Sequence, residues 1–100
     1  MLRKSLTLQG VIVKEDKLFI LQLIDRDISV RGSSLDELDA RLREKIYHEL
    51  ENVEKFNSLI PAPEKFKKIF DGRKPTLPIE RFFPHKNINI ELRLFFIKPH

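Results

Sequence analysis

The stretch that most restricts the fold is "VRGSSLDELDARLREKI" at residues 30–46, where a strand passes abruptly into a helix. Gly32 can adopt a positive φ at no steric cost, so the chain can turn sharply out of a sheet there. Ser34 and Glu37 have the spacing of a capping box, in which the hydroxyl accepts from the backbone and the carboxylate reaches back. The stretch therefore predicts a helix that begins directly beside the end of a strand.

Apolar residues recur at three- and four-residue steps after this start, which is the spacing of one helical face. They predict an amphipathic helix over residues 35–54, whose apolar stripe consists of Leu35, Leu38, Leu42, Ile46, Leu50 and Val53. A stripe of this length must be buried against another layer of structure, and the neighbouring segments indicate that this layer is a sheet.

Strand-like segments lie on both sides of this helix. Residues 5–13 and 17–25 flank the charged turn "KEDK" and predict a hairpin, and residues 28–32 predict a short third strand. After the helix, residues 87–98 alternate apolar with polar side chains, as a half-buried strand does. Between them, Pro63 can begin a short second helix that Gly72 would end.

We therefore predict a single α+β domain over residues 1–100. Its expected element order is β-β-β-α-(short α)-β, with a four-stranded, mostly antiparallel sheet and one long amphipathic helix packed on one face.

Charge is unevenly distributed along the chain, although the net charge is only +4. Residues 33–54 contain seven acidic and three basic side chains, whereas residues 65–86 contain two acidic and seven basic ones. These segments can pair within the fold, pair between subunits, or leave the basic part free for a partner.

The basic part includes a proline-rich arm at residues 72–87, which we expect to be ordered but irregular. Cations beside aromatic rings suit single-stranded nucleic acid, because cations neutralise phosphates and rings stack on bases. The candidate binding residues for nucleic acid or a protein partner are Arg73, Lys74, Arg81, Phe82, Phe83, His85 and Lys86. Alternatively, the two phenylalanines pack the arm onto the sheet and the cations are solvated.

A second candidate surface lies at the end of the last strand, where Phe95 and Ile97 interrupt the polar face. Such apolar positions call for a covering element or a partner. Together with an unpaired sheet edge, they predict a homo-oligomer, a dimer or larger, with Phe95 and Ile97 in its interface.

Several function classes find no support in the residues. The chain has no cysteine, which excludes disulfides and favours a reducing compartment, and we expect the cytoplasm. No apolar run is long enough to span a bilayer, and we read the start of the chain as a strand rather than a signal peptide. No glycine-rich phosphate loop, activated nucleophile or convergent carboxylate set is evident. We therefore predict no enzymatic activity, no cofactor and no metal.

The element order and the capped helix start resemble the HicB-like antitoxin domain, which has a partial ribonuclease-H-like fold. The residues that carry this resemblance are Gly32, Ser33, Ser34, Leu35, Asp36 and Glu37, then Ile60 to Pro63, then the strand from Ile88. The resemblance implies a non-enzymatic interaction module, antitoxin-like, that self-associates and binds or masks a toxin-like protein partner. The alternative that the residues themselves leave open is a small single-stranded nucleic-acid-binding protein using residues 73–86.

Overall fold

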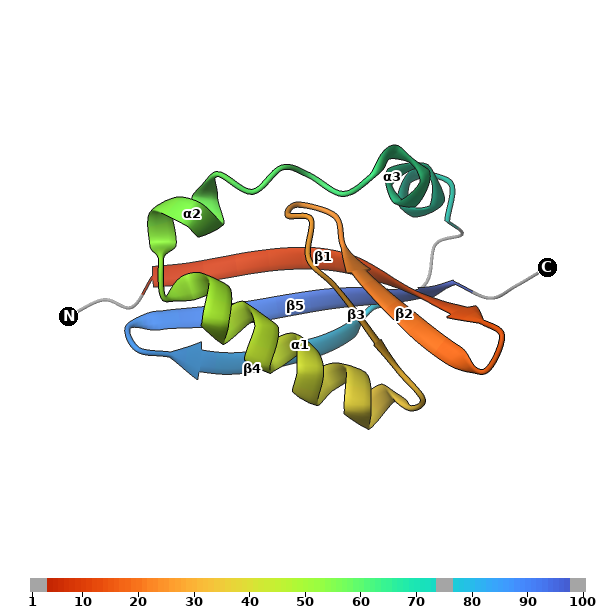
Figure 1. The fold of residues 1–100 in the computed structure, drawn as a ribbon, viewed down its shortest axis with the longest axis horizontal. Coiled ribbons are helices and arrows are strands. Elements are labelled where there is room, and N and C mark those ends of the chain that lie inside the picture. The colour runs from red at the N-terminus through yellow and green to blue at the C-terminus, as the bar shows by residue number, and fades with distance from the viewer. Residues whose placement is uncertain (1–3, 74–76, 98–100) are drawn as a thin grey trace.

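The computed structural model describes residues 4–73 and 77–97, so Lys74 of the candidate arm lies outside the described residues. The chain forms one layer of strands with helices around it (Figure 1). The elements, in chain order, are β1 (Lys4–Glu15), β2 (Leu18–Leu23), β3 (Ser29–Gly32), α1 (Leu35–Leu50), α2 (Val53–Asn57), α3 (Glu64–Asp71), β4 (Ile79–His85) and β5 (Ile88–Ile97).

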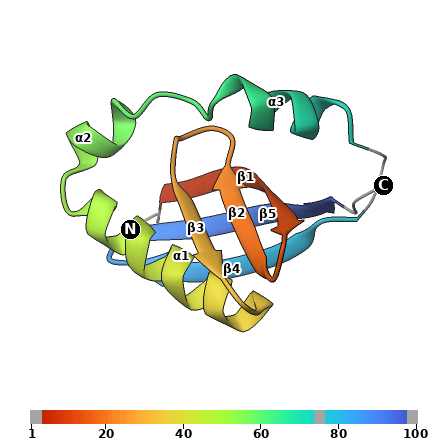
Figure 2. The ribbon, with the colours of Figure 1, turned by 45° about the vertical axis from the view of Figure 1, so that its right-hand side comes forward.

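The prediction of a four-stranded, mostly antiparallel sheet was wrong in the number of strands and in their direction. It has five strands in the order β3-β2-β1-β5-β4, and it curves into a half-barrel (Figure 2). β5 pairs in parallel with the central strand β1, from Lys4 opposite Ile88 to Val13 opposite Ile97, while the other pairs are antiparallel. The sheet is therefore mixed, because the chain returns to β1 only after crossing over through its helices.

The additional strand is β4, which forms from the arm that we expected to be irregular. Its register places Phe83 opposite Ile90 and His85 opposite Ile88 across a tight hairpin. Lys86 in the hairpin turn has a φ of 55°, in the left-handed region that such turns require. Pro84 obscured this strand in the sequence, but a proline is tolerated in an edge strand, where a missing N–H removes no ladder bond.

Helix α1 begins at Leu35 as predicted and ends at Leu50, four residues before the predicted end. Asn52 then starts a new helix, because its side chain accepts a hydrogen bond from the backbone of Lys55 at 3.0 Å. The expected stripe is buried at Leu38, Leu42, Ile46 and Leu50. Its two outer members remain largely exposed: Leu35, the first residue of α1, at 41%, and Val53, which lies beyond the end of α1 in α2, at 50%.

The start of α1 differs from a standard capping box in one detail. The Ser34 hydroxyl accepts from the Glu37 N–H at 3.2 Å, as predicted. The Glu37 carboxylate, however, reaches past the cap to Ser33, accepting from its hydroxyl at 2.8 Å and its N–H at 3.3 Å. Gly32 does not use a positive φ. A Cβ there would lie 3.2 Å from the Glu37 side chain. The glycine is therefore needed because it leaves space for Glu37 at the start of α1, and not because it forms a left-handed turn.

The sheet has a helix face and an outer face, which are covered to different extents. On the helix face, α1 and α2 enclose one hydrophobic core, whose fully buried members include Leu8, Leu21, Leu42, Ile46, Phe56 and Ile90. On the outer face, α3 lies over one end only, and none of its own residues is fully buried. The other end of the outer face carries no helix (Figure 1).

Candidate interaction surface

Three of the arm's seven candidate residues are engaged by α1. Asp39, Arg43 and Tyr47 are four residues apart on this helix, and Arg81, Phe83 and His85 are two apart on β4. Four helical residues rise about 6 Å, and two strand residues rise almost 7 Å, so the two series stay in step. The two elements run in the same direction (Figure 1). The helix residues therefore meet the strand residues in the same order along the chain.

These pairs are specific contacts. Arg81 Nε lies 3.7 Å from Asp39 Oδ1, and the Arg43 guanidinium lies 5.2 Å from the centroid of the Phe83 ring. The Tyr47 ring stacks on His85 with centroids 4.6 Å apart and meets Phe83 edge-on at 5.5 Å. The acidic helix and the basic arm therefore pair within the chain, which is the first of the three arrangements that the charge pattern allowed.

Phe83 and His85 consequently face α1, and His85 as a whole is half-buried. Phe83 is only 5% exposed and belongs to the hydrophobic core. His85 Nε2 is buried and has no hydrogen-bond partner among the described residues. A base or a phosphate cannot reach either group without opening the contact between α1 and β4.

Arg73, the first candidate of the arm, lies between two rings. Its guanidinium is 4.0 Å from the centroid of Phe70 and 4.2 Å from that of Phe95, and its Nη1 donates to the Phe70 carbonyl oxygen at 2.6 Å. The Phe70 and Phe95 rings also meet edge-on at 5.7 Å. Arg73 therefore joins the end of α3 to the sheet.

The same contact covers one of the two residues predicted for the oligomer interface. Phe95 is 7% exposed, because α3 of its own chain lies over it, whereas Ile97 is half-buried. The sequence predicted that either another element of the chain or a partner covers this position. In the structure, α3 covers Phe95. Phe95 therefore does not offer an exposed apolar surface.

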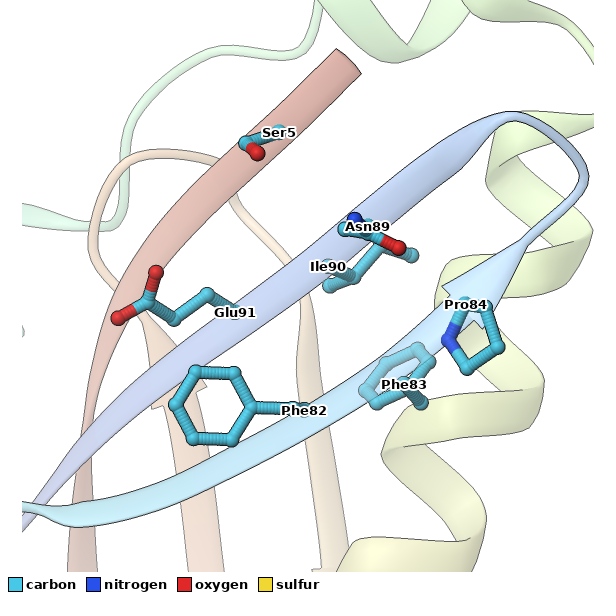
Figure 3. Close-up of a pocket in the computed structure, with 7 residues that line it drawn as sticks. All are labelled: Ser5, Phe82, Phe83, Pro84, Asn89, Ile90 and Glu91. Carbon is cyan, nitrogen blue, oxygen red and sulfur yellow. The ribbon is translucent and has the colours of Figure 1, made fainter. Parts of the chain in front are cut away.

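The exposed aromatic residue of the arm is Phe82, at the centre of β4. Its side chain is 64% exposed and points to the outer face, on the same side of the sheet as Glu91 (Figure 3). A shallow cavity of about 430 Å³ opens beside it, and its lining includes Ser5, Phe82, Pro84, Asn89 and Glu91. We call this area the open end of the outer face. Lys86, the last candidate of the arm, is exposed in the turn at the end of β4.

Sequence reasoning missed Tyr47, which organises the contact between α1 and β4. Its hydroxyl donates to the Pro84 carbonyl oxygen at 2.9 Å, in addition to its two ring contacts. The available signal was its position next to Ile46 at the border of the apolar stripe, where an amphipathic ring with a polar tip is suited to a sheet edge.

Glu37, at the start of α1 beside β3, has a shifted pKa. Hydrogen bonds from the side chain and backbone of Ser33 lower the pKa of Glu37 from its ordinary value, and the nearby Arg41 guanidinium lowers it further. Arg41 is ion-paired with Glu37 at 2.6 Å and also donates to the Arg31 carbonyl oxygen on β3. The edge strand β3 is thus tied to α1 by a side chain.

No helix in residues 4–73 and 77–97 combines the length and the hydrophobicity that crossing a bilayer demands. Comparisons with protein-family models, with curated proteins and with solved structures gave no significant match for this chain.

Proposed function

We propose that this protein is a non-enzymatic, antitoxin-like interaction module that self-associates and binds or masks a toxin-like protein partner. The observation that carries the proposal is the open end of the outer face, where an uncovered sheet surface borders the edge strand β4. An exposed aromatic ring beside polar groups is the composition that protein interfaces favour. The absence of cysteine favours the cytoplasm as the compartment.

The residues that carry the resemblance to the HicB-like domain form two ordered local features. The helix start from Gly32 to Glu37 is capped and packed against the end of β3. The "IPAP" segment at 60–63 follows the loop between β2 and β3, because Asp27 N–H donates to the Ile60 carbonyl oxygen at 2.7 Å and Ala62 N–H to that of Ile24 at 3.1 Å. Both features are elements of the resemblance.

The nucleic-acid alternative has less support from the same contacts. A strand-binding arm needs rings that are free to stack and cations that are free to meet phosphates. Phe83 is in the core, Arg81 is paired with Asp39, and Arg73 lies between two rings. A protein partner, in contrast, needs only the surface that the fold leaves uncovered.

The test is co-expression with the protein encoded by the adjacent reading frame. We expect the adjacent protein to arrest growth when expressed alone, growth to be restored when this chain is present, and both proteins to purify as one complex. Ser5→Arg places a long cation at the open end of the outer face, and we expect it to weaken the complex at least about tenfold, or 1.4 kcal/mol.

Ser29→Arg is the matched control, because Ser29 is an exposed serine at the opposite edge of the sheet, on β3. We expect this variant to bind as the parent does. An adjacent protein that neither arrests growth nor binds this chain would contradict the antitoxin-like proposal. Equal loss of binding in both variants would contradict the assignment to the open end.

A further inference from the structure

The two edge strands of the sheet differ in how well their backbones are protected. An edge strand presents unpaired N–H and C=O groups, which proteins commonly blunt by shortening or covering the strand. β3 is only four residues long, and its Arg31 carbonyl oxygen accepts from the Arg41 side chain of α1. β4 is seven residues long and has Phe82 exposed at its centre.

The register shows which backbone groups of β4 point away from the sheet. The Asn87 carbonyl oxygen accepts from Lys4 N–H at 3.1 Å, so the backbone of residue 87 points toward β1. Because directions alternate along a strand, Ile88, Ile90, Leu92 and Leu94 of β5 then point toward β4. Their partners on β4 are the odd-numbered residues. The backbones of Glu80, Phe82 and Pro84 therefore point outward.

Two of these outward-pointing carbonyl oxygens already accept a hydrogen bond from a side chain. Arg81 Nη1 donates to the Glu80 carbonyl oxygen at 3.0 Å, and the Tyr47 hydroxyl donates to that of Pro84 at 2.9 Å. Pro84 has no N–H to offer. Within residues 4–73 and 77–97, the outward groups of β4 that remain for a new strand are the N–H of Glu80 together with the N–H and C=O of Phe82.

We propose that a second copy of this chain pairs antiparallel with β4, around a two-fold axis at Phe82. This inference rests on the self-association in the proposed function and names its surface. In this register the two Phe82 residues exchange both of their backbone hydrogen bonds. Each Glu80 N–H donates to the Pro84 carbonyl oxygen of the other copy, which accepts it on its second lone pair while it still accepts from Tyr47. The resulting sheet is continuous across the two copies.

The self-complementarity of this register is the main argument for a second copy as the partner. Glu80 faces Pro84 of the other copy, which cannot donate to the Glu80 carbonyl oxygen. That same oxygen already accepts from Arg81, so no acceptor is left without a donor. The two exposed Phe82 rings become cross-strand neighbours on the outer face, where aromatic pairs are favourable.

Neighbouring registers of the same pairing are less favourable. A shift of the axis to Arg81 places two guanidinium groups directly opposite each other, which destabilises a strand pair. A shift of the axis to Phe83 sets each Phe82 against Pro84 of the other copy, which has no N–H, and leaves the Phe82 carbonyl oxygen without a donor.

The first test removes the outward N–H at the axis. Because the Phe82 N–H takes no part in the β4–β5 ladder, Phe82→Pro leaves the intrachain bonds in place. We expect it to raise the dimer dissociation constant by about tenfold or more in sedimentation equilibrium, since two mutual hydrogen bonds and an aromatic pair are lost. Arg31→Pro, which removes an outward N–H from the other edge strand, is the matched control and keeps the dimer.

The second test does not depend on a proline variant folding. The chain has no cysteine, so a single introduced thiol reports on one position. In a hydrogen-bonded pair the two Cα atoms are about 5.5 Å apart, which a disulfide spans, so Phe82→Cys should give a covalent dimer on mild oxidation. Glu80→Cys, on the same strand and face, places its two thiols about 14 Å apart at ~3.4 Å per residue and should not cross-link.

The outcomes separate the inference from the proposed function. A dimer that withstands Phe82→Pro, or equal cross-linking at positions 80 and 82, overturns the β4 pairing and leaves self-association standing through another surface. A parent chain that sediments as a monomer at all accessible concentrations, with no cross-link at position 82, overturns self-association itself.

Discussion

At the residue scale, Gly10 shows how closely the strands and the core approach each other. A Cβ at this position would lie 3.0 Å from the Gln22 carbonyl oxygen, 3.1 Å from Leu23 Cδ2 and 3.2 Å from Leu94 Cδ2. The nearest of these atoms is backbone and cannot move aside as a flexible side chain can. The glycine that seems to interrupt the first strand in the sequence is therefore required for its packing.

We predict that Gly10→Ala destabilises the protein by about 1–3 kcal/mol, the usual cost of overpacking a core. Urea denaturation followed by circular dichroism measures this change. Gly72→Ala is the control, because its φ is −92° and its added Cβ meets only the Lys68 carbonyl oxygen, at 3.3 Å. Gly10→Ala with unchanged stability would show that the sheet expands there without cost.

A second residue-scale prediction follows from the lowered pKa of Glu37. Hydrogen bonds from Ser33 and the Arg41 guanidinium favour the ionised carboxylate in the folded state. The stabilisation is therefore fully present above the ordinary pKa of a glutamate, and is lost as the pH falls through the lowered pKa of the folded state. We expect Glu37→Gln to lower the melting temperature at pH 7, with a difference that disappears under strongly acidic conditions.

Glu44→Gln is the control for this pH dependence. Glu44 is exposed on the same helix and forms no ion pair within the described part of the chain. Its substitution removes the same charge without removing the contacts at the helix start. A melting difference for Glu37→Gln that stays constant from pH 7 to strongly acidic pH would contradict the role given to its carboxylate.

At the element scale, the position of β4 depends on a match between helix and strand spacings. Residues four apart on α1 and two apart on β4 advance by nearly the same distance, so three side-chain pairs form together. Tyr47 is the member of this set that also reaches the backbone of β4. Its substitution therefore tests whether α1 positions the edge strand.

We predict that Tyr47→Phe keeps the ring contacts but costs about 0.5–1.5 kcal/mol, the net value of one hydrogen bond. Tyr47→Ala should cost more, because the contacts with Phe83 and His85 are lost as well. Hydrogen exchange is the measurement, and protection should fall first in the β4–β5 hairpin. Uniform loss of protection over the whole sheet would mean that Tyr47 stabilises the fold without positioning β4 in particular.

At the scale of the whole molecule, the acidic helix α1 and the basic arm meet through an ion pair between Asp39 and Arg81. The Asp39 carboxylate lies near both Arg43 and Arg81, at 3.4 Å and 3.7 Å. The open end of the outer face is uncovered and includes a carboxylate, Glu91. This arrangement favours a protein surface over a phosphate backbone as the partner.

We predict that the protein binds single-stranded oligonucleotides only weakly at physiological salt, within the non-specific range of roughly 10⁻⁴ to 10⁻⁶ M. Arg81→Gln combined with Phe82→Ala should change this affinity less than about twofold. Arg81 is paired with Asp39, and the exposed Phe82 ring lies beside the Glu91 carboxylate, which repels a phosphate. Fluorescence anisotropy across a salt series measures both. Submicromolar binding that is lost in the double variant would favour the nucleic-acid alternative instead.

The sequence alone was sufficient for features that depend on neighbouring residues. The hairpin over β1 and β2, the capped start of α1, the short helix after Pro63 and the alternation along β5 were all predicted, because caps, turns and periodicity are local properties. The charge pattern indicated that the acidic helix and the basic arm can pair, although it could not choose between one chain and two.

Only the tertiary structure decided which surfaces remained available. Pro84 is compatible with a strand only where its missing N–H would point away from the neighbouring strand. Which strand that is depends on the pairing of β4 with β5, which only the tertiary structure shows. In the same way, Phe83 is buried and Phe82 exposed because α1 covers one face of β4 and leaves the other uncovered. Two adjacent phenylalanines thus differ in exposure, because successive side chains of a strand point to opposite faces of the sheet. Only the packed structure shows which of these faces is covered.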